Sequence, residues 1–410
     1  MPVYEVPRAF FPADSRLVND YAHSAVESLP CLARLRAALA VLGADLQRQL
    51  TSPMELWRRA GQVSQLMRRA GAALAQTFPS SPAIDSSQRL GMIALEGENA
   101  DRLLGYRIYD DYFHVTRIKD MTAPEVLAQA VETSELILRD LPFTLLGLDE
   151  IIAFIEADYC LLGCFLDEPS GAAADLPEEE ADEDDPWKQF WLANGRPPAV
   201  DHDVPTFRWI VGHHFFDLCA MGCQSELRKA SLAADNGSPA AVVARAIDTA
   251  GTFLRGTTAA MWYAANYSSS LYKADIRKQM ISTRSPHGFS GTQNADYERF
   301  KSMKTEFVKL LTSKYGDRAS GWKEELDPEA QILKAFLRFK EIEIEDNEHH
   351  VLIAALRVGS EPSLLQAHAR EELERDFGAE ALEDMPRVNA LEMLRTMAHS
   401  KREELESFLS

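Results

Sequence analysis

The chain has 410 residues, 46% of them hydrophobic and 26% charged, and a formal net charge of −20, so it can bury a large core. The acidic balance argues against nucleic acid or anionic lipid as a partner, because neutralising phosphates needs clustered Lys and Arg. No apolar run approaches the roughly 18 residues that span a bilayer, and the five cysteines and the first residues suggest neither a disulfide framework nor a signal peptide. We therefore expect a cytoplasmic protein with no membrane partner, and a homo-oligomer is an open alternative.

Residues 1–166 predict an N-terminal helical region that follows a proline-punctuated extended arm over 1–20. Apolar residues recur at three- and four-residue steps over 20–78, as in amphipathic helices. The aromatic-rich segment 104–115 fits either a buried helix or a short strand. A helix is expected over 123–142, with Pro124 in its first turn, and a mostly apolar helix over 151–165.

Residues 167–186 differ in composition from everything around them. Positions 178–185 read EEEADEDD, a block of like charge that cannot offset the entropy of folding by burial. We expect a flexible acidic loop here, and a lid or a partner-binding tail are the alternatives to a plain solvated loop.

Residues 187–410 predict a C-terminal helical region. Helical spacing extends over 207–221, 239–267 and 297–315, and a last long helix begins at Pro328 and ends at Gly359. There is no internal repeat and no sustained strand alternation. The sequence therefore predicts an all-α, multi-helix globular fold in which both regions form one integrated unit.

Residues 261–300 contain what a pocket for a small, flat, charged molecule needs: aromatic walls, a guanidinium and a glycine-serine loop. The aromatic residues come first and include Tyr263, and Arg277 follows. The loop SPHGFSGTQ occupies 285–293, where proline stops a helix and the glycines permit positive φ or a close ligand approach. The alternative is a tight loop between two core helices.

Three histidine clusters are candidates for chemistry, although each also fits hydrogen-bonded core residues. They are His114 beside Asp110 and Asp111, the pair His213-His214, and the pair His349-His350.

On the last helix, His349 lies on the more apolar face, whereas His350 shares a face with Ala354 and Arg357. A small residue one turn on leaves room for a flat macrocycle, and an arginine two turns on suits its propionates. Haem iron needs a neutral imidazole on a rigid element. The helix thus predicts a metal ligand at one of these two histidines.

Two other metal sites are conceivable. Helical di-iron sites use Glu-x-x-His twice with two further Glu ligands, and Asp111-x-x-His114 and Asp346-x-x-His349 approximate that pattern with the shorter Asp. Four cysteines form the i, i+4 pairs Cys160/Cys164 and Cys219/Cys223, which suit either zinc or apolar packing.

Two motifs resemble segments of the histidine-ligated haem-dependent aromatic oxygenases, the superfamily of tryptophan 2,3-dioxygenase that includes bacterial haem-dependent tyrosine hydroxylases. The first motif is Tyr272, Arg277, Met280, Pro286-His287-Gly288-Phe289-Ser290-Gly291 and Asp296. The second is Glu348-His349-His350-Val351 followed by Arg357-Val358-Gly359, and it resembles the helix that supplies the axial histidine. Both lie in the C-terminal half of the chain.

The resemblance implies haem b between helices, an aromatic substrate in the distal pocket and O₂ as co-substrate. It makes His350 the axial ligand, with His349 as the fallback, and Arg277 the partner of a carboxylate. It assigns catalytic roles to His287 and Ser290. Contacts to substrate or cofactor fall to Phe289, Gly291, Thr292, Tyr263 and Arg357. Some relatives tether the haem through a cysteine where this chain has Ala354, so no thioether is expected.

We therefore predict an oxygenase that inserts oxygen from O₂ into a tryptophan- or tyrosine-like amino acid in specialised metabolism. Both monooxygenation and dioxygenation fit these motifs. The alternatives are a helical non-haem di-iron oxygenase and a non-enzymatic helical protein whose acidic block 178–185 recruits a basic partner.

Overall fold

Helices account for nearly all of the described chain in the computed structural model. The structure describes residues 7–12, 30–47, 53–77, 100–118, 121–144, 146–166, 203–267, 276, 279, 294–315 and 328–358. The α-helices there are α1 (Pro30–Gln47), α2 (Pro53–Thr77), α4 (Ala100–Tyr112), α5 (Ala123–Asp140), α6 (Leu148–Gly163), α8 (Asp203–Asp235), α9 (Ala240–Ala264), α12 (Ala295–Tyr315) and α13 (Pro328–Val358). The prediction of an all-α fold is confirmed.

Helix α5 shows how closely local chemistry sets these boundaries. The backbone N–H of Thr122 donates to the Glu125 carboxylate at 2.7 Å, one half of a capping box, and Pro124 occupies the first turn. The helix gives way to a 3₁₀ turn over Leu141–Phe143. The helix predicted over 123–142 is thus confirmed.

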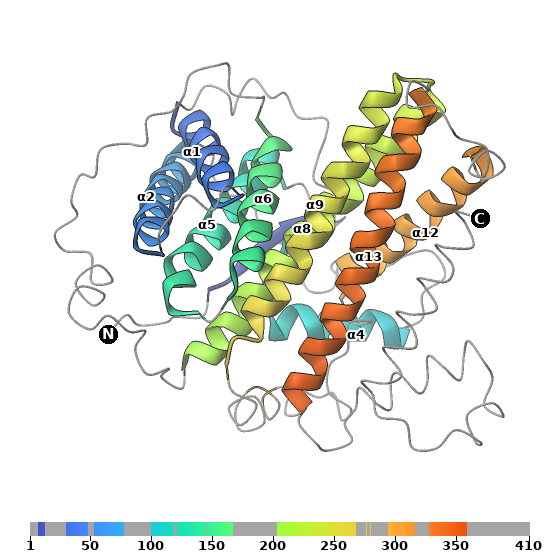
Figure 1. Cartoon of the computed structure of the whole chain (residues 1–410). Helices are drawn as coiled ribbons and strands as arrows, with labels where there is room; N and C mark the ends of the chain where they lie inside the picture. The colour runs from blue at the N-terminus through green and yellow to red at the C-terminus, as the bar shows by residue number, and fades with distance from the viewer. Residues whose placement is uncertain are drawn as a thin grey trace.

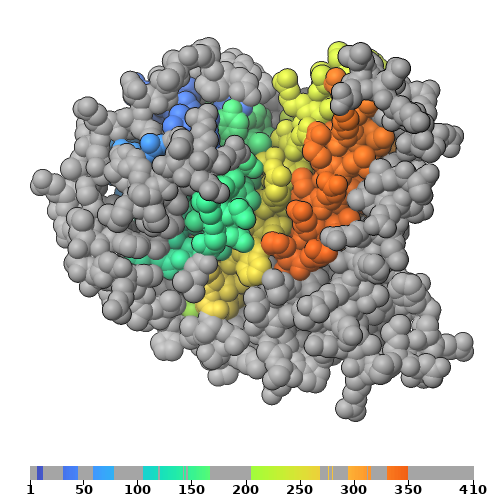
Figure 2. Space-filling view, viewed as in Figure 1, coloured from blue at the N-terminus to red at the C-terminus, as the bar shows by residue number. Residues whose placement is uncertain are grey.

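The long α8–α9 pair forms the centre of the fold. Helices α1, α2, α5 and α6 gather on one side of this pair, and α12 and α13 lie on the other (Figure 1). A Cβ added at Gly212 of α8 would lie 2.6 Å from the Ala264 Cβ of α9, so the glycine permits the close crossing of the two helices. On the surface, α9 lies between α6 and α13 (Figure 2).

The described part of the chain also contains two four-residue strands, although the sequence shows no sustained strand alternation. Strand β1 (Ala9–Pro12) pairs in parallel with β2 (Val115–Ile118). The arm over 1–20 was predicted to be extended, but four residues are too few to show alternation. The segment 104–115 is both helix and strand, because α4 ends in a turn where His114 has φ 55° and β2 follows directly.

Several predictions fall outside the described residues. These are the acidic loop 167–186, the glycine-serine loop 285–293 and the site residues Arg277, His287, Phe289, Ser290, Gly291 and Thr292. The backbone of α13 includes positions 350 and 357. None of the described helices is long and apolar enough to cross a membrane.

Candidate functional site

A buried arginine network lies at each end of segment 268–293, of which the structure describes only Ile276 and Gln279. The chain reaches this segment from α9 and leaves it into α12. We call the network beside the end of α9 the upstream network and the one beside the start of α12 the downstream network.

The upstream network centres on Arg208 of α8. Its guanidinium donates to both carboxylate oxygens of Asp140, at 2.6 and 3.2 Å, and to the backbone carbonyls of Asn266 and Phe143, each at 2.8 Å. The hydroxyl of Tyr263 donates to the same carboxylate at 3.0 Å. Arg208 and Asp140 are each only 2% exposed, so this pair fixes the chain just beyond α9 from within the core.

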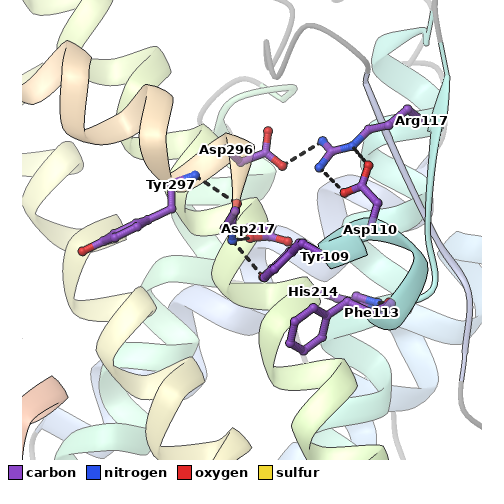
Figure 3. A network of polar contacts seen from close by, with 9 residues as sticks. Tyr109, Asp110, Phe113, Arg117, His214, Asp217, Asp296 and Tyr297 are labelled. Carbon is purple, nitrogen blue, oxygen red and sulfur yellow. Dashed lines mark hydrogen bonds and ion pairs between the residues drawn. The ribbon is translucent and has the colours of Figure 1, made fainter. Parts of the chain in front are cut away.

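The downstream network centres on Arg117 of β2. Its guanidinium donates twice to Asp110, at 2.9 and 2.7 Å, and once to Asp296 at 2.8 Å (Figure 3). Burial alone lowers the pKa of Arg117, but the charges of the two carboxylates more than offset it and raise the pKa above its ordinary value. Arg117 therefore stays charged and ties α4 and β2 to the first turn of α12.

Asn294, the first residue after segment 268–293, connects the start of α12 to this network. Its side-chain oxygen accepts the backbone N–H of Tyr297 at 3.0 Å, which makes it the N-cap of α12. Its amide donates to the hydroxyl of Tyr109 at 2.8 Å and to Oδ1 of Asp217. The first residue after the segment is thus fixed by both a cap and a buried polar contact.

Asp217 is a third carboxyl beside a single guanidinium. Burial, and then the charge of Asp296, raise its pKa well above the ordinary value, and its Oδ2 has no hydrogen-bond partner. This setting favours the protonated form of Asp217 over its charged form, because a second buried negative charge beside Asp296 would be costly.

Of the first two histidine clusters, His114 lies at the surface, and His213 and His214 lie in the core. His114 is exposed in the turn after α4. His213 Nδ1 lies 2.6 Å from the carbonyl of Trp209, and His214 Nε2 lies 2.6 Å from that of Phe113. Burial lowers the pKa of His214 to about 4, so it is a neutral core residue.

The third cluster lies on α13. The indole N–H of Trp262, from α9, donates to Nδ1 of His349 at 2.8 Å. Three residues earlier on α13, Asp346 accepts the hydroxyls of Thr257 and Thr258. This region of α13 is therefore fixed against α9 by polar contacts.

The di-iron alternative finds no support in the described part of the chain. Asp346 is engaged by α9, and Asp111 pairs with Arg107 on its own helix at 3.7 Å. Across the described ranges, no three His, Cys, Asp or Glu side chains come together as a metal site. Burial raises the pKa of the Cys160 thiol to about 12 and raises those of Cys219 and Cys223, so these cysteines are protonated packing groups.

One line of α13 positions faces α12. Phe336 packs against Phe307 of α12, with ring centroids 6.4 Å apart, and Glu343 accepts the ammonium of Lys304 at 2.7 Å. The contacts of α13 with α12 that the structure describes are thus at Phe336 and Glu343.

Sequence reasoning missed the residues of both networks, apart from Tyr263, Asp110 and Asp296. Two signals were present: charged residues inside apolar helical patterns at Arg208 and Asp217, and an asparagine directly before the start of a helix at Asn294. Tyr263 was predicted to contact substrate or cofactor; its ring is 1% exposed, and its hydroxyl belongs to the upstream network.

The fold and these contacts define an all-α protein that fixes both ends of an aromatic, glycine-containing segment from within its core. A family model described as SfmD 3-methyl-L-tyrosine peroxygenase matches residues 16–325, well over half of the chain. The chain belongs to this family, and the protein is an enzyme, as predicted. The match ends before α13, so the candidate axial histidines lie beyond it.

One solved structure is similar to the chain only at low sequence identity. A crystal structure of reduced SfmD, obtained by soaking with sodium hydrosulfite, is 17% identical to the chain. The alignment covers 84% of this chain and 98% of that chain, with a TM-score of 0.49. No curated protein matches.

Proposed function

We propose that this protein is a haem-dependent enzyme that transfers oxygen to the aromatic ring of tyrosine or of a ring-substituted tyrosine. The observation that carries the proposal is the family match over residues 16–325, whose description names 3-methyl-L-tyrosine and a peroxygenase. An oxidation of this kind serves specialised biosynthesis, in keeping with the hydroxylase-like resemblance of the C-terminal motifs.

The donor chemistry of α13 fits a histidine-ligated haem. An imidazole is the axial donor that such a haem takes, and α13 carries two in succession. The Nδ1 of His349 is engaged by Trp262, which favours His350 as the ligand. Arg357, on the same line of the helix as His350, would pair with a propionate. When bound, the haem supplies the oxygen-transfer chemistry, and the chain orients the substrate and excludes water.

Segment 268–293 supplies the substrate contacts in this proposal. Arg277 would pair with the carboxylate of the amino acid, and the loop residues Phe289, Ser290, Gly291 and Thr292 would hold its ring and polar groups. His287 would hold or accept a proton at its imidazole. The ring of Tyr263 would form a wall, because its hydroxyl is already bound to Asp140.

Hydrogen peroxide replaces O₂ as the first candidate for the oxygen source, because the family is described as a peroxygenase family. One oxygen atom of the peroxide enters a ring C–H bond as a hydroxyl, and the other leaves as water. With O₂ instead, the same product requires two external electrons and two protons.

The test is the full chain expressed with a haem precursor and given L-tyrosine or 3-methyl-L-tyrosine. We expect a Soret band and, with hydrogen peroxide, a product that has gained one oxygen atom, measured by mass spectrometry. Parallel reactions with O₂ and a reductant identify the oxygen source. Protein that binds no haem and oxidises neither amino acid would refute the proposal.

Two outcomes separate the alternatives. Iron without porphyrin would favour a non-haem oxygenase. Absence of both, with a basic partner lost on deletion of residues 178–185, would favour a binding protein. The ligand assignment is tested by His350→Ala, which should lose the wild-type Soret band, while His349→Ala should keep it.

A further inference from the structure

A groove of about 490 Å³ lies between the first halves of α9 and α13, two helices that lie side by side (Figure 2). Its walls carry three cationic side chains, those of Arg245, Lys334 and Arg338, and one carboxylate, that of Asp248. The whole chain has a net charge of −20, so the groove has the opposite sign to the molecule. None of the residues proposed to bind haem or substrate lines it.

An ion pair bridges the two walls of the groove. The guanidinium of Arg338, on α13, donates to both carboxylate oxygens of Asp248, on α9, at 2.7 and 2.8 Å. Trp262 and His349 meet further along the same two helices, so α9 and α13 run parallel. The bridge therefore fixes the register of the two helices and neutralises one of the three cations.

The other two cations, Arg245 and Lys334, line the groove from opposite walls. They lie three and four residues before Asp248 and Arg338, so each is about one turn nearer the start of its helix than the bridge. Among the residues that the structure describes, no carboxylate pairs with either cation. Two like charges at one level of a groove repel each other, and an anion between them relieves that repulsion. This level of the groove is thus suited to an anion.

The placement of the donors favours a phosphate over a carboxylate. Cations approach from two sides, and the amide of Gln331 lines the same groove. A phosphate monoester carries a charge of about −1.5 to −2 at pH 7 and has three acceptor oxygens, whereas a carboxylate carries one charge and has two. A guanidinium makes a bidentate contact with phosphate, and an ammonium acts on it as a point charge.

The positive stretch is too short for an extended acidic peptide. The exposed residues that follow Arg338 on the same face of α13 are Glu341 and Glu345. Their carboxylates would repel acidic side chains that continued along the helix. The volume of the groove is also in the range of small-molecule sites. A small ligand with one phosphate group fits these limits.

From this arrangement we propose that the groove between α9 and α13 binds a dianionic phosphate group, with Arg245 and Lys334 as its cationic contacts. The group comes either from free phosphate or from a small phosphomonoester. The inference is independent of the proposed oxygenase activity, because the groove lies along the first half of α9, whereas segment 268–293 follows the other end of that helix. Both side chains are exposed, so the attraction weakens as ionic strength rises.

The first test is isothermal titration calorimetry of the full chain in a phosphate-free buffer of low ionic strength. Inorganic phosphate, glycerol 3-phosphate and succinate are the three ligands. We expect one phosphate site, with an affinity about tenfold or more above that for succinate and lower in added NaCl. Tighter binding of glycerol 3-phosphate than of inorganic phosphate assigns the site to a phosphomonoester. Equal or weaker binding assigns it to free phosphate.

The second test removes the two cations one at a time. Arg245→Gln and Lys334→Gln should each weaken phosphate binding by about tenfold. Arg255→Gln is the matched control, because Arg255 is an exposed arginine of the same helix that pairs with Glu156 outside the groove. It should change the affinity by less than about twofold. Circular dichroism checks that all three variants are folded.

Several outcomes would overturn the inference. They are the absence of phosphate binding at low ionic strength, equal affinity for succinate, unchanged binding in both groove variants, and an equal loss in Arg255→Gln. A synthetic peptide EEEADEDD, which repeats residues 178–185, tests the other kind of occupant. If it binds more tightly than either phosphate and loses affinity in Arg245→Gln, the groove is a peptide site instead.

Discussion

The two networks at the ends of segment 268–293 use the same side chain in different charge environments. Upstream, the guanidinium of Arg208 pairs with the carboxylate of Asp140. It also donates hydrogen bonds to the backbone carbonyls of Asn266 and Phe143. Downstream, Arg117 faces Asp110 and Asp296. Asp217 is near enough that the charge of Asp296 raises its pKa. Among the described residues, the upstream network sets one carboxylate against its guanidinium, whereas the downstream network sets two carboxylates and the nearby carboxyl of Asp217 against its guanidinium.

This difference shows that a core can fix both ends of one segment through buried ion pairs that differ in their sensitivity to mutation and pH. A buried ion pair contributes little net stability over an apolar alternative, but breaking it leaves a buried charge that is strongly unfavourable. Each network therefore disfavours other arrangements of its end of the segment. The downstream one includes a carboxyl, that of Asp217, whose pKa burial raises well above its ordinary value.

The largest expected effect is the loss of either arginine. Arg117→Met removes the guanidinium from two buried carboxylates and should lower the free energy of unfolding by about 5 kcal/mol or more, whereas Arg208→Met removes it from one and should cost about 3–5 kcal/mol. Urea denaturation followed by circular dichroism measures both. Arg117→Lys keeps the charge without the paired geometry and should fall between wild type and Arg117→Met. Equal losses for the two methionine variants would contradict the charge difference between the networks.

A smaller effect distinguishes the carboxyls within the downstream network. Asp296→Asn removes a charged partner of Arg117 and should cost about 2–4 kcal/mol. Asp217→Asn should cost less than about 1 kcal/mol near pH 7, because an amide resembles the neutral acid and can still accept from Asn294. The same denaturation experiment ranks the two variants. A larger loss for Asp217→Asn would mean that Asp217 is ionised in the folded protein.

The pH dependence of stability follows from the same raised pKa. Folded protein keeps a proton on Asp217 that unfolded protein releases above about pH 4, so this carboxyl makes stability fall as pH rises from there to its raised pKa. Asp217→Asn should flatten that fall. Asp158 provides a comparison outside both networks, because burial raises its pKa to about 7. Asp158→Asn should remove a similar slope between about pH 4 and 7.

The sequence predicted the helices well because apolar spacing is a local property, readable within one or two turns. It did not predict the networks, because their partners are far apart along the chain: Arg208 and Asp140 are 68 residues apart, and Arg117 and Asp296 are 179 apart. For the same reason, it located the two histidines of α13 but could not choose between them. The hydrogen bond that His349 accepts from Trp262 likewise joins residues 87 apart.

The smallest expected effect concerns the two tyrosines of the networks. Tyr263→Phe removes one of several donors to Asp140, and Tyr109→Phe removes an acceptor of the Asn294 amide, which still reaches Asp217. Each should cost about 1 kcal/mol, because the remaining partner of each group stays in place.

The KM for the tyrosine substrate tests whether the hydroxyl of either tyrosine contributes to substrate binding. If Tyr263 is only a wall of the pocket, Tyr263→Phe should leave KM unchanged, since the phenyl ring remains and the hydroxyl was bound to Asp140. A several-fold rise in KM, with no matching rise in Tyr109→Phe, would instead mean that the hydroxyl turns to the substrate. The upstream network would then be part of the binding site, and the downstream network alone would be scaffold.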